Sequence, residues 1–172
     1  MPATQEDLMR FLDGLGIAVT TVSHPPLFTV GQSQALRGEI PGGHTKNLFL
    51  KDKKDQVFLL VAGEDAHIDL KHLHHRIGAS GRLSFGKPEL LQELLGVAPG
   101  AVTAFGLIND VPPRVQVVLD AALMQEEIVN CHPLVNTATT SIASAGLLAF
   151  IRATGHEPRI VPLDDDAPAP EL

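Results

Sequence analysis

The chain has 172 residues, of which 44% are hydrophobic and 19% are charged, as is typical of an ordinary globular domain. It has neither Trp nor Tyr, so any aromatic platform for a nucleic-acid base must come from its seven Phe residues. The N-terminus has no basic region followed by an apolar core, and no apolar stretch approaches membrane-spanning length. We therefore expect a cytoplasmic location and no membrane partner. The single cysteine, Cys131, excludes an internal disulfide and a cysteine-cluster zinc site.

The net charge of −7 argues against DNA as a partner, because binding to a duplex depends on Lys and Arg that neutralise phosphates. Residues 164–172 contribute four acidic groups and no basic one, which leaves 13 basic against 16 acidic residues in 1–163. Basic clusters remain at 46–54 and 71–76. A contact with one end of a nucleic acid needs only a few such charges on one face.

The first predicted element is a helix that begins after Thr4 and ends near Gly14 or Gly16. Thr4 and Asp7 have the spacing of a capping box, and the apolar residues that follow share one face. The next predicted elements are a strand over 17–22, a turn at 24–26, a short strand leading into a helix over 28–37, a loop over 38–43, and a hairpin of buried strands at 48–50 and 57–61.

The second half alternates short strands with amphipathic helices. Its predicted elements are a helix from Asp69 to Ile77, a strand over 82–85, a helix from Pro88 to Gly96, strands over 101–107, 115–119 and 127–130, a helix over 144–154, and a strand over 159–162. This order does not fit a regular βαβ alternation. We expect an α+β fold with a curved, mixed and mostly antiparallel sheet, in one domain over 1–163 followed by a disordered acidic tail over 164–172.

Lys46 stands immediately before the apolar run 48–50, in a chain with no conventional catalytic triad. An ammonium that is half withdrawn from water is costly unless it meets an anion or a carbonyl, which makes Lys46 a candidate ligand-binding group. The alternative is that its side chain extends to solvent from a strand end.

The histidines at 72, 74 and 75 suggest a metal site, but on a helix only His72 and His75 share a face, and the nearest carboxylate, Asp69, is also the predicted cap. A solvated helix face is the simpler interpretation. Cys131 and His132 are neighbours on a predicted strand, so they face opposite sides and cannot form a nucleophile and base pair. The glycines of 38–43 lack the spacing of a phosphate-binding loop.

Three polar segments near the ends of apolar runs remain, at 46–47, 100–110 and 131–137. In the last, the sequence His132-Pro133 favours an extended backbone before a turn, and Asn136 can donate and accept hydrogen bonds there. This suits the rim of a pocket for a small polar ligand, and an ordinary loop with an Asx turn is the alternative.

Together these segments resemble the YbaK and ProX family of aminoacyl-tRNA deacylases, the free-standing relatives of the editing domain in bacterial prolyl-tRNA synthetase. The chain is most similar to its alanyl-tRNA(Pro) deacylase branch, ProXp-ala. Residues 45–50 resemble the family's lysine strand, 105–110 its glycine-loop strand, and 132–136 with 137–141 its closing strand. The resemblance runs from the first helix to Val161.

This resemblance implies a sheet curved into a barrel-like core with helices around it, and no metal or other cofactor. It implies that Lys46 is the functional lysine, near the ester or the terminal nucleotide, and that the loop at Gly100 brings backbone N–H groups to the aminoacyl carbonyl. The implied substrate-binding residues are Asn47, Phe105, Gly106, Asn109, His132, Pro133 and Asn136. The family's loop often has proline four residues after the glycine, whereas this chain has Ala104, which lacks the rigidity of proline.

The implied function is hydrolysis of mischarged alanyl-tRNA(Pro), which protects translation fidelity when a synthetase cannot exclude alanine by contacts alone. Because the ester is already activated, a positioned water, a backbone oxyanion site and a ribose hydroxyl as proton carrier are compatible with the missing triad. The expected partner is the acceptor end of aminoacyl-tRNA(Pro), with transient association with prolyl-tRNA synthetase or an elongation factor. The alternatives are a cysteinyl-tRNA(Pro) deacylase of the YbaK type, a tRNA-binding module without catalysis, and a histidine-based metal hydrolase that chelators would inhibit.

Overall fold

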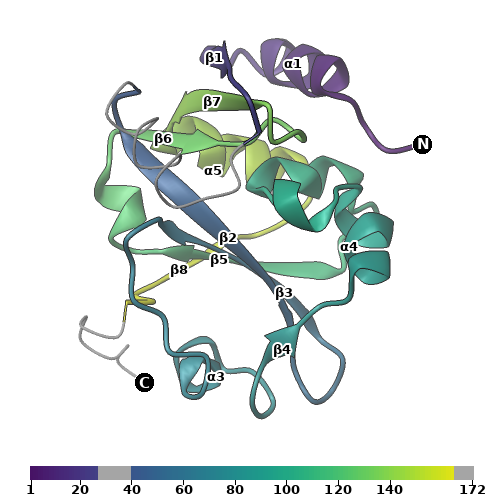
Figure 1. Ribbon diagram of the computed structural model, residues 1–172, viewed down its shortest axis with the longest axis vertical. Coiled ribbons are helices and arrows are strands. Elements are labelled where there is room, and N and C mark those ends of the chain that lie inside the picture. Colours follow the sequence, from purple (N-terminus) through teal and green to yellow (C-terminus); the bar gives the residue numbers. More distant parts are fainter. Residues whose placement is uncertain (27–39, 165–172) are drawn as a thin grey trace.

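The computed structural model describes residues 1–26 and 40–164 (Figure 1). Its helices are α1 (Gln5–Gly14), α3 (Leu73–Ile77), α4 (Pro88–Leu95) and α5 (Ser144–Ala153), with the 3₁₀ helices η1 (Pro99–Ala101), η2 (Ala104–Asn109) and η3 (Leu123–Gln125). Its strands are β1 (Val19–Ser23), β2 (Gly43–Lys51), β3 (Val57–Gly63), β4 (Ser84–Phe85), β5 (Val115–Asp120), β6 (Ile128–Cys131), β7 (Ala138–Ala143) and β8 (Arg159–Val161). The elements predicted over 28–37 and the tail over 165–172 lie outside the described residues.

The strands form one eight-stranded sheet in the order β1-β7-β6-β2-β3-β5-β8, with β4 on β2. The pairs β1–β7, β7–β6, β2–β3 and β2–β4 are antiparallel, whereas β6–β2, β3–β5 and β5–β8 are parallel. The predicted mixed sheet surrounded by helices is thus confirmed. Among the described residues β1 and β8, the outermost strands of this order, do not pair with each other, so the sheet is not closed into a complete barrel there.

Strand β2 connects the two parts of this sheet (Figure 1). It pairs with β6 through Gly43 and His44 and with β4 through Leu50 and Lys51, while β3 runs along its other edge. Between the contacts with β6 and β4, on the edge of β2 away from β3, residues 45–48 have no strand beside them within the described chain. The backbone around Lys46 and Asn47 therefore lies at a gap in the sheet.

The centre of the sheet is covered on both faces. Phe49, Leu59 and Val117 belong to one buried cluster, which also contains residues of α1, α4, η2 and α5. Leu50, Leu60 and Val118 belong to a second cluster, which is closed by residues of α3 and by Leu163. Burial on both faces explains why residues 57–61 are apolar without alternation.

The helix predicted after Thr4 is confirmed, including its capping box with Asp7, and so is the hairpin of β2 and β3. The predicted strands at β5, β6 and β8 and the helices α4 and α5 are also confirmed to within a few residues. No helix of the described residues is long and apolar enough to cross a membrane.

The strand predicted over 101–107 is wrong, because this segment forms η1 and η2. The Thr103 side chain accepts a hydrogen bond from Phe105 N, and Gly106 N donates to the Thr103 carbonyl, which closes a 3₁₀ turn. A short apolar run buried on all sides does not distinguish a strand from such a turn.

The helix predicted from Asp69 is shorter than expected. The Asp69 carboxylate accepts from Lys71 N and lies 2.7 Å from His72 Nδ1, so it holds a turn, and α3 begins only at Leu73. The strand predicted over 82–85 is likewise reduced to the two residues of β4.

Candidate active site

Lys46 and Asn47 lie inside β2, because this strand begins at Gly43 and not at the apolar run. Neighbouring side chains on a strand face opposite sides of the sheet. The half-buried Lys46 donates from Nζ to the carbonyl of Ala66, on the connection that follows β3. A carbonyl is one of the two kinds of partner that compensate a partly desolvated ammonium. Asn47 lies on the other face, with Phe49.

The loop that contains Gly100 is joined to the His132-Pro133 segment by Thr103. The fully buried Thr103 hydroxyl donates to the His132 carbonyl at 2.6 Å and accepts from Phe105 N at 3.2 Å. Thr103 was not among the predicted site residues, although a threonine just before an apolar run is a typical N-cap. These two hydrogen bonds restrain the loop at the point where Ala104 replaces the proline that is common in the family.

Gly100 lies close to Asn136, in the same segment as His132 and Pro133. A Cβ atom at Gly100 would meet only Asn136 Nδ2, at 3.7 Å, which is an ordinary contact distance. The fold itself therefore does not require glycine here, and the space beside its backbone is open to a ligand. Leu134, within the facing segment, has a φ of 71°, a strained conformation for a leucine of the kind found at functional sites.

His132 Nδ1 lies 3.2 Å from the carbonyl of Ala138, so Nδ1 carries the hydrogen and Nε2 is left as an acceptor. Burial lowers the pKa of His132 below its ordinary value, against the hydrogen bond to Ala138, which raises it. The neighbouring charge of His24 lowers this pKa further, while that of Glu64 raises it. The imidazole is therefore neutral at neutral pH.

A cavity of about 280 Å³, called here the Asn47 cavity, lies between β2, β4, α4 and the loop of η1. It is lined by Asn47, Phe49, Phe85, Gly86, Pro88, Leu91, Pro99 and Val102. The Asn47 Oδ1 atom is buried and has no hydrogen-bond partner among the described residues. An unsatisfied buried acceptor costs about 1–3 kcal/mol, so this amide is a strong candidate for ligand binding.

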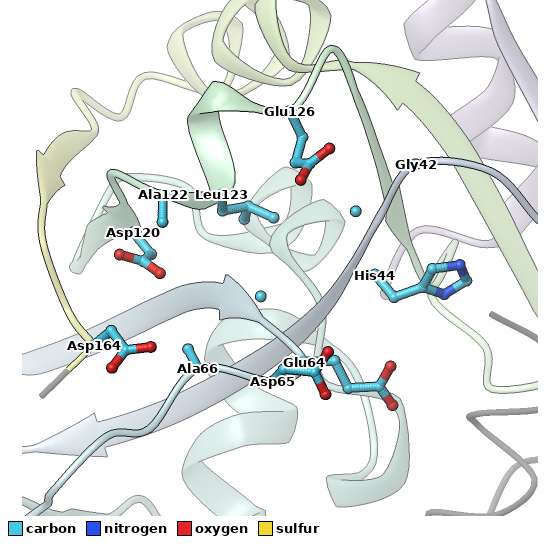
Figure 2. Close-up of a pocket in the computed structure, with 12 residues that line it drawn as sticks. Gly42, His44, Glu64, Asp65, Ala66, Asp120, Ala122, Leu123, Glu126 and Asp164 are labelled. Carbon is cyan, nitrogen blue, oxygen red and sulfur yellow. The ribbon is translucent and has the colours of Figure 1, made fainter. Parts of the chain in front are cut away.

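A second cavity, of about 370 Å³, lies where the parallel strands β3, β5 and β8 end (Figure 2). Its lining includes the carboxylates of Glu64, Asp65, Asp120, Glu126 and Asp164. Ala66, whose carbonyl binds Lys46, also lines it. Figure 2 shows Asp120, Asp164 and Glu126 on different sides of this cavity. Such an acidic lining repels phosphate and other anions.

The aminoacyl-tRNA editing domain family matches this sequence over residues 24–150, a range that contains every candidate site residue. The chain belongs to this family. It is 39% identical over 162 residues to prolyl-tRNA synthetase associated domain-containing protein 1 of Danio rerio, with 93% of this chain and 88% of the relative covered. It is 38% identical over 146 residues to the prolyl-tRNA editing protein ProX of Acetoanaerobium sticklandii, with 84% and 88% covered.

Solved structures show the same fold at low sequence identity. A protein described as a candidate trans-editing enzyme for prolyl-tRNA synthetase superposes with a TM-score of 0.68 at 22% identity, with 94% of this chain and 99% of that chain covered. A scaffold used for computational grafting of epitopes gives 0.73 at 20% identity, with 97% and 100% covered. The resemblance inferred from the three polar segments is thus confirmed at the level of family and fold.

Within this editing domain, three of the predicted substrate-binding residues have contacts that are structural. The Phe105 ring is fully buried and packs edge-on against Phe150, with centroids 5.2 Å apart. A Cβ atom at Gly106 would lie 3.1 Å from the Leu95 carbonyl oxygen. Asn109 donates to that carbonyl at 2.9 Å and accepts from Ala3 N at 2.8 Å.

The structure thus divides the predicted site residues into three groups. Asn47, Gly100, His132 and Asn136 gather around the loop of η1, with Pro133 buried next to His132. Lys46 lies on the opposite face of β2, whereas Phe105, Gly106 and Asn109 of η2 make structural contacts.

Cys131 supplies no nucleophile to this editing domain. Burial raises the pKa of its thiol to about 11, although the hydroxyl of Thr45, 3.7 Å from Sγ, lowers it. The thiol is therefore protonated at neutral pH, and only the thiolate is a strong nucleophile. The described residues also contain no group of three His, Cys, Asp or Glu side chains that could hold a metal ion.

Proposed function

We propose that this protein is a trans-editing hydrolase that removes alanine from mischarged alanyl-tRNA(Pro), and that residues 1–163 act as one editing domain. The observation that carries the proposal is the joining of the Gly100 loop to His132 by Thr103, beside the unsatisfied amide of Asn47. The likeness to a prolyl-tRNA editing protein, ProX, supports an editing reaction on tRNA(Pro). The substrate partner is the acceptor end of tRNA(Pro), with prolyl-tRNA synthetase or an elongation factor as a transient partner.

In this reaction a water molecule attacks the ester carbonyl carbon. The bond from this carbon to the ribose oxygen breaks, the amino acid leaves as a carboxylic acid, and the ribose hydroxyl is regenerated by a proton from the water. Backbone N–H groups at Gly100 stabilise the oxyanion, and neutral His132 accepts a hydrogen bond at Nε2 that orients the attacking water. Lys46 is not a nucleophile: its ammonium, bound by the Ala66 carbonyl on the opposite face of β2, acts as a charge that positions this strand and Asn47 beside the ester.

A tRNA-binding module without hydrolysis is the second candidate. This candidate is favoured by the hydrogen bond from the Lys46 ammonium to the Ala66 carbonyl, because the resemblance to the family implies that this ammonium lies near the ester or the terminal nucleotide. The change Lys46→Ala separates the two candidates, with Lys54→Ala in the exposed turn after β2 as a matched control. An editing enzyme loses deacylation in the Lys46 variant while the variant stays folded, as its thermal unfolding measures. Equal rates for wild type and Lys46→Ala would contradict the assigned role.

The amino-acid specificity is tested on wild-type protein with alanyl-, cysteinyl-, seryl- and prolyl-tRNA(Pro). We expect alanine to be released fastest. If alanyl-tRNA(Pro) stays intact while cysteinyl-tRNA(Pro) is hydrolysed, the protein is a deacylase of the YbaK type. If all four esters stay intact, the binding module is the better account.

A further inference from the structure

The candidate site residues belong to two parts of the sheet that meet at one short contact. His132 follows β6, in the part formed by β1, β7 and β6, whereas Asn47 belongs to β2, in the part formed by β2, β3, β4, β5 and β8. Within the described chain, these two parts pair directly only through two residues of β2, Gly43 and His44. The placement of Asn47 relative to His132 therefore depends on how this contact is held.

The side chain of Asn130, on β6, lies at this contact and is 2% exposed. Its Nδ2 donates to the carbonyls of Pro41 at 3.1 Å and Gly43 at 3.4 Å, while its Oδ1 accepts from the Ser141 hydroxyl on β7. The opposite orientation of the amide would place Oδ1 against two carbonyl oxygens, so the hydrogen-bond network fixes the orientation. The Asn130 carbonyl also accepts from the Thr45 hydroxyl at 2.7 Å. Asn130 thus binds three residues in and just before β2.

The backbone before β2 packs directly on β6 at this point. Gly42 has a φ of 106°, which favours glycine, and a Cβ atom there would lie 2.9 Å from the Ile128 carbonyl oxygen and 3.1 Å from Asn130 Nδ2. This close approach brings the Pro41 and Gly43 carbonyls to the amide. A hydrophobic side chain at Asn130 would fill the same space but leave both carbonyls without this donor. The amide therefore holds the contact as well as filling it.

We propose that Asn130 is a positioning residue for the deacylation: its amide fixes β2 against β6 and thereby sets the placement of Asn47 relative to His132. Asn130 acts through these two residues and not on the ester itself. A shift at the contact moves Asn47 relative to His132, and a misplacement of about 1 Å costs on the order of 100-fold in rate. This inference rests on the proposed function and names what holds its site together.

The test compares Asn130→Ala and Ser141→Ala with Asp52→Ala in single-turnover deacylation of alanyl-tRNA(Pro), at a temperature where thermal unfolding shows each variant to be folded. Asp52 is the matched control, because its carboxylate is 3% exposed and accepts from three backbone N–H groups just beyond the other end of β2. Asn130→Ala should slow the chemical step about 10- to 100-fold, and Ser141→Ala should slow it less. Asp52→Ala should keep the wild-type rate. The affinity for uncharged tRNA(Pro) should stay unchanged in all three, because their basic side chains remain in place.

A second measurement needs no hydrolysis. The NMR signals of the Asn47 side-chain amide should shift in Asn130→Ala and stay at their wild-type positions in Asp52→Ala. The inference is overturned if folded Asn130→Ala hydrolyses the ester at the wild-type rate, or if Asp52→Ala loses as much activity as Asn130→Ala. A wild-type protein that releases no alanine would refute the proposed function, and unmoved Asn47 signals in Asn130→Ala would then overturn the placement as well.

Discussion

At the scale of single residues, two glycines of the same segment are glycine for different reasons. Gly106 packs against the Leu95 backbone, whereas a Cβ at Gly100 would touch only Asn136. We predict that Gly100→Ala lowers the deacylation rate by at least about tenfold, because the methyl group takes space needed by the ester and its oxyanion. Its free energy of unfolding in urea should stay within about 0.5 kcal/mol of wild type.

Gly106→Ala serves as the comparison. It should destabilise the protein by about 1–3 kcal/mol, because the added methyl group has no room beside Leu95. A Gly100→Ala variant that keeps full activity would show that the loop does not contact the substrate.

The lowered pKa of His132 gives a pH dependence of known sign. Because burial holds this pKa below the ordinary value of 6.5, the folded protein keeps His132 neutral at neutral pH. After subtraction of uncatalysed hydrolysis, the deacylation rate should fall as the pH drops through the lowered pKa, and His132→Gln should lack this step. By linkage, the contribution of His132 to stability is complete above pH 6.5 and is lost as the pH falls below it.

At the scale of elements, the loop of η1 depends on Thr103. We predict that Thr103→Val slows deacylation, because it removes the hydroxyl that donates to the His132 carbonyl and accepts from Phe105 N. The loss of these buried bonds should also cost about 1–2 kcal/mol of unfolding free energy. Thr103→Ser keeps the hydroxyl and should retain most of the activity. Equal losses in both variants would assign the effect to packing.

The elements also show which parts of the structure the sequence can predict. Helix α4 was predictable because Pro88 opens it and Gly96 ends it in a left-handed conformation. The segment 101–107 was not, because its 3₁₀ turns depend on the hydroxyl of Thr103 and on its bond to a residue 29 positions later. The pattern of the residues alone contains no signal for such a long-range contact.

The candidate site was predictable in part for the same reason. The order of its three polar segments can be read from the sequence. Which of their side chains lie on which face of the sheet depends on where β2 begins. Since β2 begins at Gly43, Lys46 and Asn47 face opposite sides of the sheet. Asn109 looked like a ligand-binding residue, yet it binds Leu95 and Ala3.

At the scale of the whole molecule, the charge distribution predicts how binding depends on salt. The net charge is −7, and five carboxylates line the cavity of Figure 2, so we expect the proposed RNA substrate to contact only a few basic side chains. For roughly two or three neutralised phosphates of a single strand, the logarithm of the affinity should fall with the logarithm of the salt concentration with a slope of about −1.5 to −2. Titrations of uncharged tRNA(Pro) at several salt concentrations measure this slope. A slope near −6 would mean an extensive backbone interface.

The arrangement of the whole sheet also explains how a few polar groups come together at the candidate site. Along the edge of β2 away from β3, β6 pairs with one end and β4 with the other, and a gap is left between them. The loop of η1 and the segment after β6 meet at that gap. The Thr45 hydroxyl, which donates to the Asn130 carbonyl at 2.7 Å, joins β2 to β6 at one side of it. The candidate site is therefore at a gap along one edge of β2, and the loop of η1 and the segment after β6 cover this gap.

The most direct test of the central claim compares release of alanine and of proline from tRNA(Pro) under single-turnover conditions, with protein in excess. We predict that alanyl-tRNA(Pro) is hydrolysed on the order of 100-fold faster than prolyl-tRNA(Pro), whose rate should stay near that of the uncatalysed reaction. Uncatalysed rates for both esters, or faster release of proline than of alanine, would contradict the assignment of this protein as an alanyl-tRNA(Pro) deacylase.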